Sequence, residues 1–298
     1  MNRIRLGIPR LLALLLPALL FVGDARPALA QDDIDAFMER VLERRVTNWE
    51  DLYRYTLRDR EVIDITGPDG ARIESQVGEY IWYVREGYMV RSPYTLNGAR
   101  VGDNEREEFE SRYLERVRVS DEEREANEGL EEGADIEREY FLGFPFEAGN
   151  YYLVGYEDFE GQEVAKIEYY PEELFEDEGD DEEDQRWTRR FQKTSRIVLW
   201  VLVEEHQILK VAYDNVGLDF LPYRWLVQVD DVRAELIMHK PFEGEDVYLP
   251  REILIAGEMT VATGTFSVSY SLEYFDYKET DIGARVRFRL PGVEQQNE

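Results

Sequence analysis

Two segments that are apolar at every position constrain the fold more than any other feature of this sequence. Residues 80–84 read Tyr-Ile-Trp-Tyr-Val and residues 197–203 read Ile-Val-Leu-Trp-Val-Leu-Val, compositions that favour β-strands. Because successive side chains of a strand point to opposite faces, both faces of these strands must be covered. The chain therefore needs packed layers on both sides of at least part of its sheet.

Most other segments have the two-residue period of half-buried strands. In residues 266–274, apolar side chains at even positions alternate with Ser267, Ser269, Ser271 and Glu273, as in an antiparallel sheet with one face in water. Short turns, such as Glu160-Gly161, separate the apolar runs. Strands are predicted at 51–65, 72–85, 88–92, 150–170 (a hairpin), 197–204, 208–215, 224–230, 232–239, 247–257, 259–262, 265–277 and 284–290.

Two amphipathic helices accompany these strands. One is predicted at 33–46, where Ile34, Phe37 and Val41 lie on one helical face, and the other at 104–117. A large sheet with few helices protects its faces and edges by curving. We therefore predict a mainly β fold: a strongly curved antiparallel sheet or unclosed β-barrel of about ten strands, with two or more covering helices.

The N-terminus predicts export. Three arginines precede the apolar run 11–22, and Ala28-Leu29-Ala30 follows it, which is typical of a signal peptide (residues 1–30) cleaved after Ala30. The run is shorter than the roughly 20 apolar residues of a membrane-spanning helix. Residues 31–298 are then expected to form a single periplasmic domain, with charged insertions at 102–138 and 176–196.

Charge and cysteine content remove several function classes. The formal net charge is −30 at pH 7, which repels nucleic acid. With 43% hydrophobic and 13% aromatic residues, the chain is too apolar for a disordered polyanion. It has no cysteine, so disulfides, zinc-thiolate sites and a lipidated N-terminal cysteine are excluded.

The sequence offers few candidates for catalysis. His206 and His239 lie in predicted loops, belong to no metal-binding pair and accompany no nucleophile motif, so we expect structural or solvent-facing histidines. Asp230-Asp231 could act as a carboxylate pair, but a turn between two strands explains it. We predict no catalytic residue, metal site or cofactor.

The role of the acidic run at residues 176–184 stays open. Residues 176–184 contain eight acids in nine positions, which fits a solvated loop or weak divalent-cation binding, although EF-hand spacing is absent. Five basic residues follow, which either neutralise the acidic run or form a rim for an anionic headgroup. They are Arg186, Arg189, Arg190, Lys193 and Arg196.

The aromatic content is the stronger functional indication. A curved sheet too wide for its own side chains to fill leaves an apolar cavity, and such cavities bind apolar ligands. We expect six residues on one apolar sheet face to line it. They are Tyr83, Trp200, Trp225, Val268, Tyr270 and Leu272.

The order of these segments resembles the outer-membrane lipoprotein-sorting superfamily of the LolA, LolB and RseB type. The resemblance rests on the signal peptide, the helix at 33–46, the long strand at 51–65, and the hairpins YYLVGYEDFEGQEVAKIEYYP and SRIVLWVLVEEHQILKVAYDN. The resemblance implies an unclosed β-barrel whose helices cover a hydrophobic cavity. It also implies a non-enzymatic periplasmic carrier of acyl chains. This chain is longer and more acidic than the family pattern, so its cargo could be a lipoprotein, another lipid or an envelope protein partner.

Two other functions fit the sequence. A cell-envelope hydrolase acting on a polysaccharide or ester would need carboxylates, or a serine and a histidine, to converge in a cleft. An integral outer-membrane barrel would use the alternating strands to cross the bilayer. The N-terminal soluble helix, the charge density and the C-terminal Val-Glu-Gln-Gln-Asn-Glu argue against the barrel, so we predict a protein that is not membrane-integral.

Overall fold

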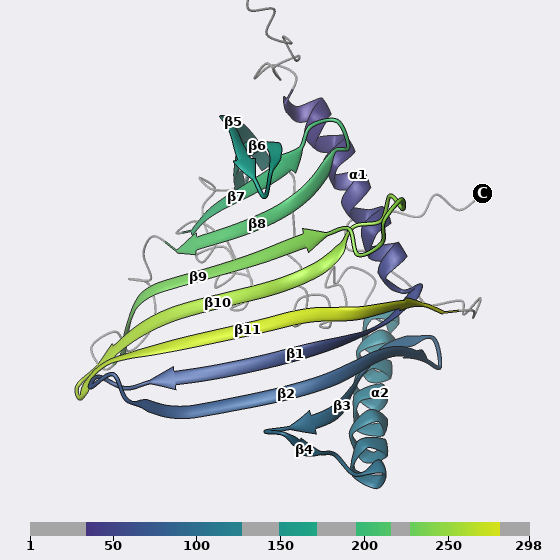
Figure 1. Ribbon diagram of the computed structural model, residues 1–298, viewed down its shortest axis with the longest axis vertical. Coiled ribbons are helices and arrows are strands. Elements are labelled where there is room, and N and C mark those ends of the chain that lie inside the picture. The colour runs from purple at the N-terminus through teal and green to yellow at the C-terminus, as the bar shows by residue number, and fades with distance from the viewer. Residues whose placement is uncertain (1–33, 127–148, 172–194, 216–226, 281–298) are drawn as a thin grey trace, which may run out of the picture.

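A computed structural model describes residues 34–126, 149–171, 195–215 and 227–280 (Figure 1). In these ranges all the strands belong to one antiparallel sheet of eleven strands, in the order β4-β3-β2-β1-β11-β10-β9-β8-β7-β6-β5. The sheet is strongly curved and not closed, and two helices accompany it, so the predicted fold class is confirmed. The elements are α1 (Ile34–Leu52), β1 (Tyr55–Thr66), β2 (Arg72–Arg85), β3 (Tyr88–Leu96), β4 (Ala99–Arg100), α2 (Asp103–Ala126), β5 (Gly149–Phe159), β6 (Gln162–Pro171), β7 (Ser195–Leu202), β8 (Gln207–Asn215), β9 (Val227–His239), β10 (Leu249–Val261) and β11 (Gly264–Glu279).

Pairing of β1 with β11 joins the two parts of the chain. The strands β1 to β4 come before α2, and β5 to β11 come after it, so only this ladder makes a single sheet. Sequential hairpins make the rest. The turn between β5 and β6 has positive φ at Glu160 (53°) and Gly161 (82°), as tight hairpin turns require.

Helix α1 covers one face of the sheet, which we call the α1 face. Its apolar stripe is almost completely buried, with Phe37 1% and Val41 0% exposed. The strands alternate, so register decides which of their residues share this face. They include Leu57, Trp82, Leu199, Val211, Leu236, Ile253, Leu272 and Tyr274.

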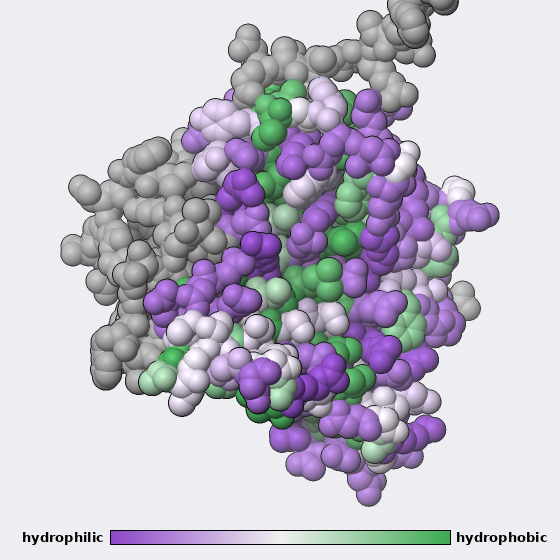
Figure 2. Space-filling view, turned by 60° about the vertical axis from the view of Figure 1, so that its left-hand side comes forward, coloured by the Kyte–Doolittle hydropathy of each residue, from purple (hydrophilic) through white to green (hydrophobic). Residues whose placement is uncertain are grey.

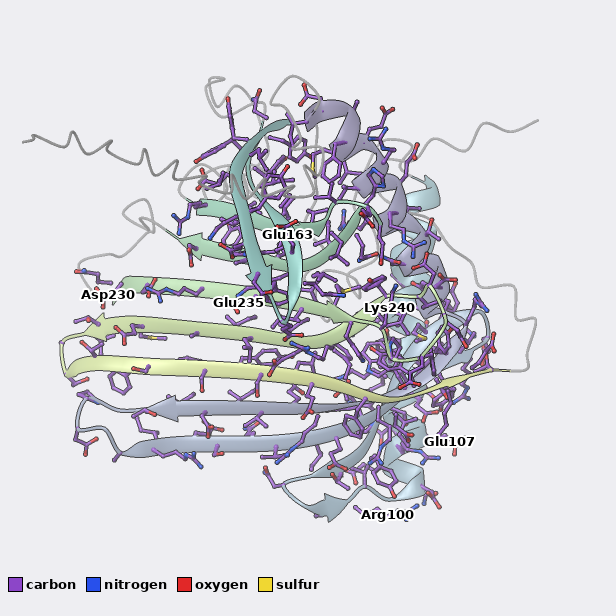
Figure 3. The ribbon with its side chains drawn as sticks, turned by 45° about the horizontal axis from the view of Figure 1, so that its top comes forward. Arg100, Glu107, Glu163, Asp230, Glu235 and Lys240 are labelled. Carbon is purple, nitrogen blue, oxygen red and sulfur yellow. The ribbon has the colours of Figure 1, made fainter. Side chains whose placement is uncertain are left out.

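The predicted burial of both faces at 197–203 is confirmed in β7. Ile197, Leu199 and Val201 join the core beneath α1. Their neighbours Val198 and Trp200 belong to a separate cluster on the opposite face, which also contains Leu209 and Tyr248. Figure 3 shows the β5–β6 hairpin crossing in front of β7 and β8, and Phe159 at its turn packs against this second cluster.

Helix α2 packs beside β3 and is longer than the predicted helix at 104–117. The Tyr113 hydroxyl donates to the Met89 carbonyl (3.0 Å). Glu110 accepts hydrogen bonds from Ser92 (2.5 Å) and Arg85 (2.7 Å). Burial alone would raise the pKa of Glu110, but hydrogen bonds from Ser92, Tyr83 and Arg85 outweigh it and lower that pKa. Part of the predicted insertion is therefore an ordered helix tied to the sheet.

The predicted turn at Asp230-Asp231 is wrong. β9 runs unbroken from Val227 to His239, and β10 is likewise continuous where a break at 257–259 was expected. Figure 3 labels Asp230 near the start of β9. Its carboxylate accepts from Thr260 Oγ1 (2.5 Å) and Gln228 Nε2 (2.7 Å), while Asp231 pairs with Arg233 (3.1 Å). These partners let two aspartates occupy strand positions.

Several predictions fall outside the described residues. They concern the signal peptide, the acidic run 176–184, the basic residues 186–193, Trp225 and the strand at 284–290. No helix within the described ranges is both long and apolar enough to span a membrane. The face of the described part that Figure 2 shows is mostly hydrophilic, with hydrophobic residues visible between hydrophilic ones.

Candidate functional site

The structure does not bring all the predicted ligand-binding residues together. Val268, Tyr270 and Leu272 lie on β11 and point to the α1 face. Tyr83 and Trp200 lie on the opposite face, because their neighbours Trp82 and Leu199 occupy the α1 face. The expectation that these residues share one face is therefore corrected.

Both displaced aromatic residues are held by local partners. The Trp200 indole donates to Glu157, and the ammonium groups of Lys166 and Lys210 each lie 5.0 Å from its ring centroid. These contacts are favourable because an indole face attracts cations. The Tyr83 hydroxyl hydrogen-bonds Glu110 of α2. Their surroundings explain both residues as structural elements of the opposite face.

Along β11, the residues on the α1 face change from fully buried to half-buried. Leu272 is 0% exposed and belongs to the core, whereas Tyr270 and Val268, further from the core, are only half-buried. The pairing register continues this half-buried apolar surface onto β1 and β10. We call it the distal strip, and it consists of Ile63, Ile65, Ile255, Met259, Phe266 and Val268.

An ion pair is buried where the distal strip meets the core. Arg91 of β3 donates through Nε and Nη2 to the two oxygens of Asp59 of β1 (2.8 and 2.9 Å). Trp82 Nε1 also donates to Asp59 (2.5 Å). The side chains of Arg91 and Asp59 are 5% and 0% exposed. Burial alone would lower the pKa of Arg91, but the hydrogen bonds and charge of Asp59 outweigh it and raise that pKa, so Arg91 stays charged.

Glu61 lies two residues beyond Asp59, between this ion pair and the strip. It accepts from Arg91 Nη2 (3.1 Å). Burial first, and then nearby charges that include Glu61, shift the pKa values of Tyr80 and Tyr270, so both hydroxyls lie close to this carboxylate. Burial raises the pKa of Tyr270 well above its ordinary value, so its hydroxyl keeps its proton. Gly78 makes room for this arrangement, because a Cβ there would lie 2.6 Å from Tyr80 Cε2.

Sequence reasoning missed this polar cluster, although a signal was present. In β1, apolar residues alternate on the α1 face at Tyr55, Leu57, Ile63 and Ile65, and this series is interrupted by Asp59 and Glu61. A charged residue at an inward strand position needs a partner. Arg91 supplies that partner from a strand 32 residues along the chain.

The two histidines take structural positions. His206, in the β7–β8 turn, has a φ of 52°, and its Nε2 accepts from Arg40 Nε of α1 (2.9 Å). Phe37 contacts its ring, with centroids 5.2 Å apart. His239 is half-buried beside Tyr277. In the part of the chain that the structure describes, no cluster of three or more His, Asp or Glu side chains could hold a metal ion.

The His206 contact predicts acid sensitivity. Burial and then Arg40 lower the pKa of His206, so the folded state binds this proton less readily than the unfolded chain does. Its contribution to stability is complete above the unfolded pKa of about 6.5 and is lost as the pH falls below it. We expect the stability difference between wild type and His206→Asn, measured by urea unfolding, to be larger at pH 7.5 than at pH 5.5. Asparagine also tolerates positive φ, and an unchanged difference would contradict the prediction.

Comparisons with known proteins give structural matches alone. No family model and no curated protein matches the sequence. A putative outer membrane lipoprotein-sorting protein domain from Vibrio parahaemolyticus is 14% identical, with a TM-score of 0.35, covering 86% of this chain and 93% of that one. A DUF1329 family protein from Desulfovibrio piger is 12% identical, with a TM-score of 0.35 and coverages of 84% and 93%. A LolA superfamily protein from Nitrosomonas europaea is 11% identical, with a TM-score of 0.28 and coverages of 79% and 91%.

These matches agree with the family resemblance in the sequence.

Proposed function

We propose that this protein is a non-enzymatic binding protein or carrier of the periplasm that shields acyl chains of a lipid or lipoprotein against the distal strip. The observation that carries the proposal is the half-buried state of Ile63, Ile65 and Val268 on the face that α1 covers elsewhere. An apolar sheet face that is not fully packed favours an apolar ligand.

The energetics are sufficient for such a role. Each buried methylene of a ligand contributes about 0.8 kcal/mol, so a chain lying along two or three strands gains several kcal/mol. Val268 pairs with Ile65 of β1 and Gly257 of β10. These three strands therefore present one continuous surface to a hydrocarbon chain.

The predicted signal peptide supports a periplasmic location, and the family resemblance supports a lipoprotein as one cargo. An envelope protein partner that delivers or receives the cargo is consistent with the same role.

Val268→Asp tests the proposal. The substitution places a charge on the distal strip, so we expect the affinity of residues 31–298 for an uncharged pyrene-labelled fatty alcohol to fall about tenfold or more, because a charge in an apolar contact must be dehydrated. Fluorescence titration measures the change. Ser267→Asp is the matched control, since Ser267 is exposed on the opposite face of the same strand, and its affinity should stay within about twofold.

Native mass spectrometry of protein purified from the periplasm gives a second measurement. A co-purifying lipid or acylated species is expected. A ligand-free spectrum together with no binding of the fatty alcohol would overturn the proposed function.

A further inference from the structure

Among the described residues, the polar cluster beside the distal strip has one more carboxylate than guanidinium group. It contains two carboxylates, Asp59 and Glu61, and one guanidinium, Arg91. Asp59 occupies two donors of Arg91 at 2.8 and 2.9 Å, in the bidentate geometry that makes such pairs strong. Glu61 accepts from the same nitrogen, Nη2, at 3.1 Å, and this nitrogen carries two N–H groups. Of the two carboxylates, Glu61 has the longer contacts with Arg91.

Glu61 is placed to meet a ligand, whereas Asp59 is not. The Glu61 side chain is 17% exposed and that of Asp59 is 0% exposed. Glu61 is also the last polar position on β1 before Ile63 and Ile65 of the strip. A partly dehydrated carboxylate at the end of an apolar surface favours a positively charged partner, because burial strengthens the attraction between opposite charges.

Two tyrosines flank this carboxylate. The Tyr80 ring stacks on Arg91, whose Cζ lies 3.5 Å from the ring centroid, and its hydroxyl lies near Glu61, which raises the pKa of that hydroxyl. The Tyr270 hydroxyl approaches Glu61 from β11 on the other side of β1. Both hydroxyls also accept hydrogen bonds, so an ammonium group at Glu61 finds up to three acceptors.

The surroundings disfavour an anionic headgroup. On the α1 face of β1, β2, β10 and β11, the described positions from Glu61 outwards include Glu74 and no lysine or arginine. The charge of Arg91 is already countered by Asp59. The formal net charge of the chain, −30, adds a general repulsion of anions.

We propose that Glu61, with Tyr80 and Tyr270, forms a headgroup subsite that binds the protonated amine of an amphiphile whose hydrocarbon chain lies on the distal strip. The proposal rests on the function proposed above and adds the headgroup class to it. Asp59 and Arg91 position the subsite and do not touch the ligand.

Three probes of equal chain length test the proposal: dodecylamine, dodecanol and dodecanoate. Each competes with the pyrene-labelled fatty alcohol for residues 31–298 at pH 7.5, in 150 mM salt. We expect dodecylamine to bind about tenfold more tightly than dodecanoate, as a hydrogen-bonded charge pair would give. Glu61→Gln should remove most of this preference and leave dodecanol within about twofold.

Glu273→Gln is the control for the effect of the protein's overall negative charge. Glu273 is an exposed carboxylate on the opposite face of β11, so this variant loses the same charge and should keep the preference for dodecylamine. Equal losses in the two variants would assign the preference to net charge and overturn the subsite.

The order of the three probe affinities for the wild-type protein tests the amine subsite even if Glu61→Gln does not fold. Equal binding of all three, or tighter binding of dodecanoate, overturns the amine subsite alone and leaves the acyl-chain function standing. Failure of every probe to bind overturns the proposed function, and the subsite with it.

Discussion

Replacing Asp59 with alanine is expected to lower the free energy of unfolding by about 3–5 kcal/mol. The substitution leaves the guanidinium of Arg91 without its bidentate partner at a site where that side chain is 5% exposed. It also removes the acceptor of the Trp82 indole. Urea unfolding followed by tryptophan fluorescence measures the change, because Trp82 is 0% exposed in the folded protein.

Two further variants show whether the loss comes from the unpaired charge. In Asp59→Leu combined with Arg91→Met, both charges are absent, so much of the stability should return relative to Asp59→Ala. Asp231→Ala removes one partner of an exposed ion pair with Arg233 and should cost less than about 1 kcal/mol. A cost for Asp59→Ala as small as that of Asp231→Ala would contradict the assignment.

The fold could be predicted where the sequence pattern is local and continuous. The i, i+3, i+4 spacing of Ile34, Phe37 and Met38 corresponds to the buried stripe of α1. The unbroken apolar run of β7 corresponds to a strand packed on both faces. In these segments burial follows directly from the residue types, so no knowledge of the partner strands was needed.

Features that depend on pairing could not be predicted. Tyr83 and Trp200 are aromatic residues of apolar strands, but which face they occupy follows from the register with distant strands. Asp230 and Asp231 resemble a turn, yet Asp231 pairs with Glu258 of β10, and Asp230 is accommodated in β9 at a shift in the pairing register. The distal strip likewise arises because β1 pairs with β11, at the opposite end of the chain.

The proposed site depends on the same pairing. β1 contributes Glu61 and Ile63, β2 contributes Tyr80, and β11 contributes Tyr270 and Val268. Two of the residues predicted as ligand contacts, Val268 and Tyr270, lie here because β11 alternates regularly. The charged partners were not predicted, because the role of a carboxylate on an otherwise apolar strand face depends on which basic side chain pairs with it.

Replacing Phe37 with alanine is expected to lower the free energy of unfolding by about 3–5 kcal/mol, the usual cost of truncating a buried phenylalanine. Phe37 is 1% exposed and contacts His206 at the β7–β8 turn, with ring centroids 5.2 Å apart. Because α1 covers the apolar face of the sheet, its loosening should also expose that face. Urea unfolding measures the first effect, and increased binding of the dye ANS to the folded variant measures the second.

Glu39→Ala is the matched control on the same helix. Glu39 is exposed, and alanine is a good helix former, so this variant should change stability by less than about 0.5 kcal/mol and leave dye binding unchanged. If Phe37→Ala cost no more than Glu39→Ala, α1 would not be packed on the sheet in solution. The α1 face would then be open along its whole length, and the boundary that defines the distal strip would disappear.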